Sequence, residues 1–265
     1  MKIGETFQSD KITYSIINVI RKEVRVGTGI FNDSFPNAVN NNFPSTLRIP
    51  NSVVQFDKVW RVTELGTCAF ANCQNINSAK IGYNIEILKE KAFFRCYNLL
   101  SIAFESRSCL KTIKTQALYD LYNVKSIEFG GDRLQIIGIY AFGFNFQLKY
   151  LRFPASVTYI DFESLRGLEK LERLDFCGKQ DIHNDVFYRN PEHSITSKNV
   201  IIRVTSKYPI NKFGLNDSVT VDNSMNCYFP QAIDEYELQC RSHNNKCYYG
   251  LFNSFLLNLI LLYNF

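Results

Sequence analysis

A short pattern recurs through the middle of the chain at intervals of 22 to 25 residues. Its most visible part is a small residue followed by a large apolar one, as in Ala69-Phe70 and Ala92-Phe93. Further copies lie at Ala117-Leu118, Ala141-Phe142, Ser164-Leu165 and Val186-Phe187. A unit of this size cannot bury its own apolar residues, so neighbouring units must stack on one another. The repeat therefore predicts an elongated solenoid.

Each repeat also contains a segment of the form L-x-x-I-x-F, for example Leu99 to Phe104 and Leu171 to Phe176. Apolar residues two apart at the end of the segment fit one face of a β-strand. The first, fourth and sixth positions then point into the core, and the second, third and fifth point outward. A second apolar segment, such as Ile85 to Leu88, leads into the small-large pair. We expect one strand per repeat, stacked as a parallel sheet, because the segments are too short for amphipathic helices.

The repeat resembles the BspA-type leucine-rich repeat of bacterial and protist surface antigens. The residues that carry the resemblance most plainly are Leu47-Arg-Ile-Pro50-Asn-Ser-Val53, Leu65-Gly-Thr-Cys68-Ala-Phe70-Ala-Asn-Cys73 and Ala92-Phe93-Phe-Arg-Cys96. The resemblance covers residues 45–205, although the copies at Ser164-Leu165 and Val186-Phe187 have drifted. It implies an α/β solenoid of leucine-rich repeats, with a parallel sheet and about 23 residues per repeat.

Three parts of the chain follow from this reading. Residues 1–44 alternate apolar and polar positions, and they are similar to the β-rich segment that precedes the repeats in these antigens. They are expected to cap the open end of the sheet. Residues 45–205 form the solenoid, and residues 206–265 form an irregular C-terminal cap and a hydrophobic tail.

The tail, Tyr248 to Phe265, has 18 residues without a charge, of which 13 are apolar or aromatic. A membrane anchor, a peripheral packing segment and an unstructured extension all stay open, because Asn253, Asn258 and Asn264 interrupt the apolar run. The first ten residues hold no apolar run typical of a secretory signal. The expected location is the cell surface or a membrane, by analogy with the antigens, with the cytoplasm as the alternative.

The eight cysteines leave the redox compartment open. Three occupy repeat positions where a buried free thiol is expected, namely Cys68, Cys73 and Cys96. Three near the C-terminus could hold one disulfide or a metal, namely Cys227, Cys240 and Cys247. Their spacing of 13 and 7 lacks the paired C-x-x-C of a zinc site, so no metal is expected.

No sequence motif of an enzyme is present: phosphate-binding loops, zincin helices and nucleophile elbows are all missing. His183, His193 and His243 fall in the most drifted repeat or the tail, where surface histidines are the expected interpretation. Asp161 and Glu163 are expected to be solvated carboxylates. We therefore expect no catalytic residue and no cofactor. The net charge of +5 is spread along the chain and is too small to indicate a nucleic-acid partner.

The outward positions of the strands are the candidate binding surface, because they stack in rows from coil to coil. Mixed charge with tyrosine and arginine suits a protein or glycan partner. The candidate partner-binding residues are Arg48, Lys80, Lys125, Glu128, Lys149, Tyr150, Arg152, Arg173 and Asp175. The sequence thus favours a non-enzymatic, antigen- or adhesin-like binding protein, with an intracellular scaffold for protein interactions as the alternative.

Overall fold

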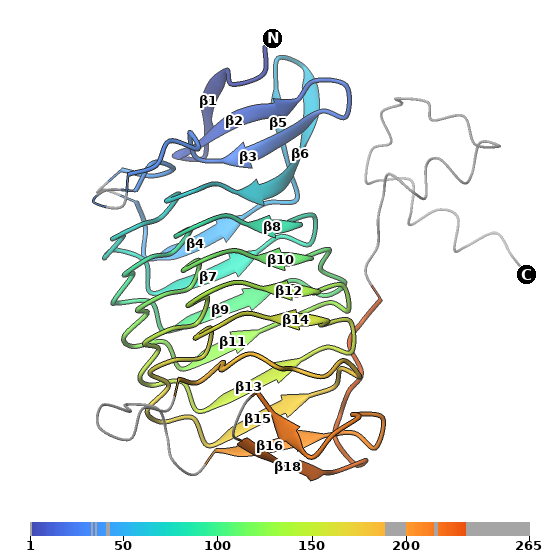
Figure 1. Ribbon diagram of the computed structural model, residues 1–265. Helices are drawn as coiled ribbons and strands as arrows, with labels where there is room; N and C mark the ends of the chain where they lie inside the picture. The colour runs from blue at the N-terminus through green and yellow to red at the C-terminus, as the bar shows by residue number, and fades with distance from the viewer. Residues whose placement is uncertain are drawn as a thin grey trace, which may run out of the picture. The chain divides into compact units, whose positions relative to one another are not determined.

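The computed structural model describes residues 2–32, 34, 36–40, 43–188, 200–214 and 217–231. The chain divides into two compact units, Met1–Ala232 and Ile233–Phe265, and the second lies outside the described residues. In the first unit, successive coils stack into a solenoid (Figure 1). The domain boundaries expected at residues 44/45 and 205/206 stay predictions.

One side of the solenoid carries the L-x-x-I-x-F strands, which pair in parallel as the pattern predicts. They form a four-stranded and a five-stranded sheet, and the pairing is interrupted between β11 and β13. The first sheet comprises β4 (Thr46–Ile49), β7 (Ser78–Ile81), β9 (Ser101–Phe104) and β11 (Ser126–Glu128). The second comprises β13 (Tyr150–Phe153), β15 (Arg173–Phe176), β16 (Ile201–Val204), β18 (Asp217–Val221) and the antiparallel β17 (Lys212–Phe213). We call the outer surface of the parallel strands in these two sheets the strand face.

A second side carries shorter strands, so the expectation of one strand per repeat was incomplete. The second apolar segment of each repeat forms a two-residue strand, and these strands also pair in parallel. They are β8 (Ile87–Leu88), β10 (Thr112–Ile113), β12 (Ile136–Ile137) and β14 (Tyr159–Ile160). At the N-terminal end this sheet continues through β6 (Lys58–Leu65), β3 (Glu23–Val26), β2 (Ile12–Asn18) and β1 (Thr6–Ser9), and β5 (Ser52–Gln55) forms a hairpin with β6.

The small-large pairs form turns, and the described part of the chain contains no helix. The parallel-sheet solenoid of leucine-rich repeats is confirmed, but turns take the place of the helical component of an α/β solenoid. The reason is a regular backbone geometry. The residue before five of the six pairs has a φ of 53 to 55°, namely Cys68, Lys91, Gln116, Tyr140 and Glu163. Such left-handed residues interrupt a right-handed helix in each of these coils, and a second left-handed residue follows four residues later.

Stacked turns and stacked rings join one coil to the next. The Phe70 amide donates to the carbonyl of Ala92 at 2.8 Å, and the Phe93 amide donates to that of Ala117 at 2.8 Å. Inside the coils the rings of Phe70 and Phe93 stack with centroids 5.0 Å apart. The small residue is buried because the coils approach closely there. Cys68, Cys73 and Cys96 are buried thiols outside any disulfide, as expected, and burial raises the pKa of the Cys96 thiol.

Asn145 is a buried polar link between two coils. Its Oδ1 accepts a hydrogen bond from the Leu121 amide at 2.8 Å, and its Nδ2 donates to the Leu118 carbonyl at 3.0 Å. Asn145→Ala leaves both backbone groups buried without these partners, so we expect it to lower the free energy of unfolding by about 2 kcal/mol in urea denaturation. Asn123→Ala removes an exposed bond to the Tyr97 carbonyl and should cost less than about 1 kcal/mol. Equal losses in the two variants would contradict the role of Asn145.

Candidate functional site

The strand register places the fifth-position side chains in rows. Arg48 lies beside Lys80, Lys80 beside Ala103, and Ala103 beside Glu128 in the first sheet. In the second sheet Arg152 lies beside Asp175, and Asp175 beside Arg203. These rows follow from strand spacing alone, because every second side chain of a strand points to the same side of the sheet.

The candidate residues differ in how far they reach the solvent. Arg48, Lys80, Lys125, Glu128, Lys149, Tyr150 and Arg173 are exposed. Arg152 is half-buried, and Asp175 is buried at 2% relative exposure. A partner on the strand face would therefore meet the side chains around Asp175 rather than its carboxylate. Whether any of the nine contacts a partner stays a prediction.

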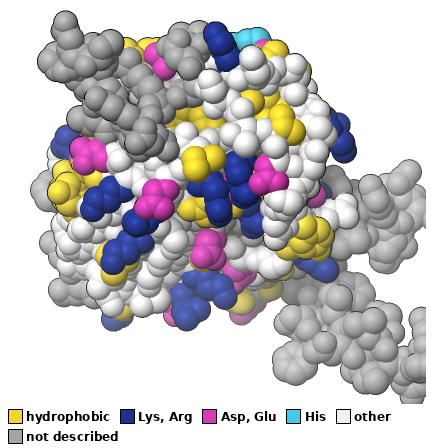
Figure 2. All heavy atoms as spheres, turned by 90° about the horizontal axis from the view of Figure 1, so that it is seen from below, with side chains coloured by type: hydrophobic (Ala, Val, Ile, Leu, Met, Phe, Trp, Pro, Cys, Tyr) yellow, Lys and Arg dark blue, Asp and Glu magenta, His cyan; other side chains and the backbone are white. Residues whose placement is uncertain are grey.

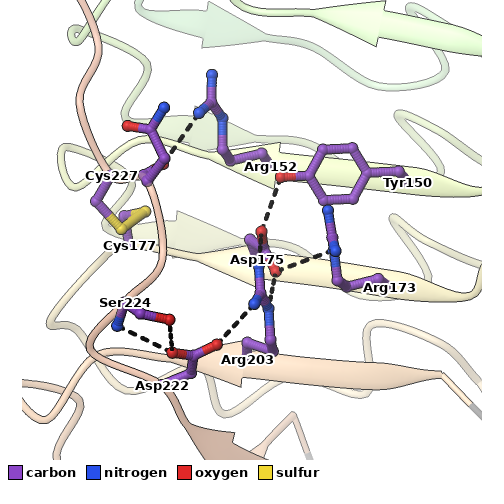
Figure 3. A network of polar contacts seen from close by, with 10 residues as sticks. Tyr150, Arg152, Arg173, Asp175, Cys177, Arg203, Asp222, Ser224 and Cys227 are labelled. Atoms are coloured by element: carbon purple, nitrogen blue, oxygen red, sulfur yellow. Dashed lines mark hydrogen bonds and ion pairs between the residues drawn. A yellow bond between two sulfur atoms is a disulfide. The ribbon is translucent and has the colours of Figure 1, made fainter.

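Asp175 is the centre of a polar network on β13, β15 and β16 (Figure 3). The Tyr150 hydroxyl donates to its Oδ2 at 2.7 Å. Arg203 donates through Nε to Oδ1 at 2.7 Å and through Nη2 to Oδ2 at 2.6 Å. Arg173 adds an ion pair at 3.6 Å, and Arg203 also reaches Asp222 at 2.6 Å. The carboxylate of Asp175 thus has partners on both oxygens.

These contacts set the ionisation of the network. Burial disfavours the charged form of Asp175, but the hydrogen bonds from Arg203 and Tyr150 outweigh it and hold the pKa of Asp175 below its usual range. Burial and the hydrogen bond to Asp175 raise the pKa of Tyr150. At neutral pH the network therefore combines two carboxylates, two guanidinium groups and a neutral phenol. Lys and Arg also alternate with Asp and Glu on the end of the solenoid (Figure 2).

A segment after β18 contacts the strand face, and we call residues 222–231 the strap. A disulfide joins Cys227 of the strap to Cys177, with their Cα atoms 5.7 Å apart. The sequence expectation grouped Cys227 with Cys240 and Cys247, which lie outside the described residues. Pairing with Cys177 was missed, because the two cysteines are separated by 50 residues and no spacing signal links them. Only stacking of the coils brings Cys177 near the strap.

The strap and the strands line an open hollow of about 530 Å³. Its lining includes Lys125, Glu128, Tyr150 and Arg152 from the strands and Phe229 and Pro230 from the strap. The hollow lies where the pairing between β11 and β13 is interrupted. Concave sites of this volume with a few polar groups are typical of ligand-binding sites. Four of the nine candidate residues are therefore brought together at one place.

Within the described residues, the remaining candidates for chemistry do not form a second site. His183 is exposed, with Nδ1 3.3 Å from Asp181, whereas His193 and His243 lie outside the described residues. The expectation that Glu163 is solvated was wrong. Glu163 is buried at 5% exposure, and its carboxylate pairs with Arg166 at 2.6 Å. The described residues hold no cluster of three potential metal ligands.

Across the described ranges, no helix has the length and apolar character needed to cross a membrane. The hydrophobic tail Tyr248 to Phe265 lies outside these ranges.

Comparison with known proteins relates the chain to a repeat family. A family described as BspA type leucine-rich repeat region matches residues 63–194 in six copies. No curated protein matches the chain. Among solved structures, the pneumococcal vaccine antigen PcpA is 24% identical with a TM-score of 0.64, covering 78% of this chain and 51% of PcpA.

Two other solved structures share the fold. A leucine-rich repeat protein from Bacteroides ovatus is 24% identical with a TM-score of 0.58, covering 83% of this chain and 54% of that one. The T. pallidum leucine-rich repeat protein is 15% identical with a TM-score of 0.52, covering 75% of this chain and 86% of that one. The chain spans about half the length of the first two of these proteins.

Proposed function

The chain belongs to the BspA-type leucine-rich repeat proteins, and from this premise we propose that it is a non-enzymatic binding protein of the cell surface. It is antigen- or adhesin-like, and it binds a protein or glycan partner through the strand face. Leucine-rich repeat proteins generally bind proteins, and PcpA is described as a vaccine antigen. The proposal extends those descriptions to this chain.

The observation that carries the proposal is the strand face itself, with exposed residues of both charges in register around a hollow. Stacked coils hold these side chains in fixed rows before any partner arrives. A surface that is already ordered loses little conformational entropy when it binds, so many modest contacts can add up to useful affinity.

The Cys177–Cys227 disulfide supports a location outside the cytosol. Disulfides persist in oxidising environments and are rare in the cytosol, where thiols are kept reduced. The alternative, an intracellular scaffold, requires these two cysteines to be reduced. Alkylation of thiols in intact cells before lysis, followed by mass spectrometry, distinguishes the two locations. Alkylated Cys177 and Cys227 would favour the scaffold.

Reversing charges on the strand face tests the binding surface. The full chain is applied to immobilised extracellular-matrix proteins and to a printed glycan array. For any protein or glycan that binds, we expect Lys80→Glu with Lys125→Glu to weaken affinity about tenfold, because charges at an interface steer and select partners. The matched control is Lys58→Glu with Lys114→Glu, two exposed lysines away from the strand face. Loss of binding in the control alone would contradict the proposal.

A further inference from the structure

One arginine of the second sheet lacks the carboxylate that its neighbours have. Arg173 and Arg203 both pair with Asp175. Arg152 is the register partner of Asp175, yet Arg203, Arg173 and Tyr150 occupy that carboxylate. Within the described residues, no ion pair joins Arg152 to any carboxylate. Figure 3 shows its side chain directed away from Asp175, toward the strap.

The strap fixes the orientation of the Arg152 guanidinium. Nη1 donates to the Asn226 carbonyl at 3.0 Å, and the guanidinium lies over the Phe229 ring, 4.5 Å from its centroid. A guanidinium has five N–H donors in a planar fork, and the bond to Asn226 uses one of them. A fork held in place on an aromatic ring is pre-organised for bidentate recognition of a carboxylate.

Arg152 lines the hollow, and Lys125 brings a second positive charge to the same lining. Glu128 is the acidic residue of this lining, so two cations face one anion. The hollow therefore favours an anionic group, and its volume of about 530 Å³ admits an entire side chain.

We propose that the hollow between β11 and β13 binds the carboxylate of an aspartate or glutamate side chain presented by a protein partner. The inference rests on the proposed function, because it names the chemistry of the partner at the strand face. An acidic sugar fits less well. Phe229 is only 7% exposed and its ring lies under Arg152, and the Tyr150 ring already has the Arg173 guanidinium 4.3 Å from its centroid. Tyr150 is the exposed aromatic residue of the described lining, and its ring already carries a guanidinium where a sugar ring could stack.

Fluorescence anisotropy with a labelled hexaglutamate peptide and the full chain tests the inference. We expect Arg152→Gln to weaken binding about tenfold, because it removes the charged fork. Lys125→Gln should weaken it about threefold, because it removes one charge from the lining. Among the described residues, no hydrogen bond or ion pair joins Lys125 to the strap, so its variant keeps the test valid if Arg152→Gln loosens the strap.

Two control variants carry the same change in net charge. Arg48→Gln changes a residue on the strand face but outside the hollow, and Lys114→Gln changes an exposed residue that is not on the strand face. Both should bind hexaglutamate within about twofold of the unaltered chain, because they leave the hollow intact. Equal losses in all four variants, or equal binding of labelled hexaglutamine, would show general charge attraction and overturn the inference.

A labelled hexaglucuronate oligosaccharide separates an acidic sugar from an acidic peptide. Binding of this sugar but not of hexaglutamate, lost in Arg152→Gln, would overturn the peptide assignment. The proposed function fails separately. If a matrix protein or glycan binds in a manner sensitive to Lys80→Glu with Lys125→Glu while hexaglutamate does not bind, the proposed function stands and this inference falls.

Discussion

Asp175→Ala is expected to lower the free energy of unfolding by about 3 kcal/mol, because removing one partner of a buried ion pair leaves uncompensated charge. Asp175 is buried, and its side chain accepts hydrogen bonds from Tyr150 and Arg203. Arg203 keeps Asp222 as a partner, which places the loss at the lower end of the range for such variants. Urea denaturation followed by circular dichroism measures the effect.

The matched control is Glu172→Ala, at the residue immediately before β15. Glu172 pairs with Lys149 at 2.8 Å, but the two side chains are 68% and 63% exposed. An exposed pair is screened by water and salt, so this variant should lose less than about 1 kcal/mol. A loss in Glu172→Ala equal to that in Asp175→Ala would mean that burial of the network adds nothing to its strength.

The pH dependence of the Asp175 contribution has a definite sign. The pKa of Asp175 is lowered in the folded protein by Arg203, Tyr150 and Arg173 against the effect of burial. A lowered folded pKa stabilises the fold above the unfolded value, which is about 3.9 for aspartate, and the stabilisation is lost as pH falls through the folded value. The difference in stability between the unaltered chain and Asp175→Asn should therefore be constant near neutral pH and shrink below about pH 4. A difference that grew in acid would contradict this assignment.

Much of the strand face could be predicted from the repeat. The alternation in L-x-x-I-x-F fixes which side chains point outward, and a constant repeat length aligns them in rows. The fifth-position series Arg152, Asp175, Arg203 even alternates in charge, which is a readable signal for ion pairing along a row. The pattern does not predict how deeply each outward-pointing side chain is buried. Asp175 is buried because three larger side chains converge on it, and their convergence depends on rotamers rather than on spacing.

The turns and the hollow were harder to predict for separate reasons. The left-handed position before five of the six small-large pairs is filled by Cys68, Lys91, Gln116, Tyr140 and Glu163, so no glycine or asparagine marks it in these repeats. The hollow needs the strap, which lies outside the repeat and follows no period. Interactions between a repeat and a non-repeating segment leave no periodic trace in a single sequence.

Reduction of the Cys177–Cys227 disulfide is expected to release the strap. In the chain-entropy account, a link closing a loop of 50 residues contributes about 4 kcal/mol. Coils of a solenoid contact only their neighbours, so the loss should concentrate near the linked end. Hydrogen exchange after dithiothreitol, or in Cys177→Ser with Cys227→Ser, should show faster exchange in the strap and in β15 and β16, with β7 and β9 unchanged.

Cys73→Ala is the matched control, because it removes a buried sulfur from the core without cutting a covalent link. It should lower the free energy of unfolding by less than about 1.5 kcal/mol and leave strap exchange unchanged. If reduction leaves the strap protected, the bond from Arg152 to Asn226 and the packing of Phe229 hold it without the disulfide. If reduction releases it, the orientation of Arg152 depends on an oxidised chain, and binding at the hollow is confined to compartments that keep the disulfide formed.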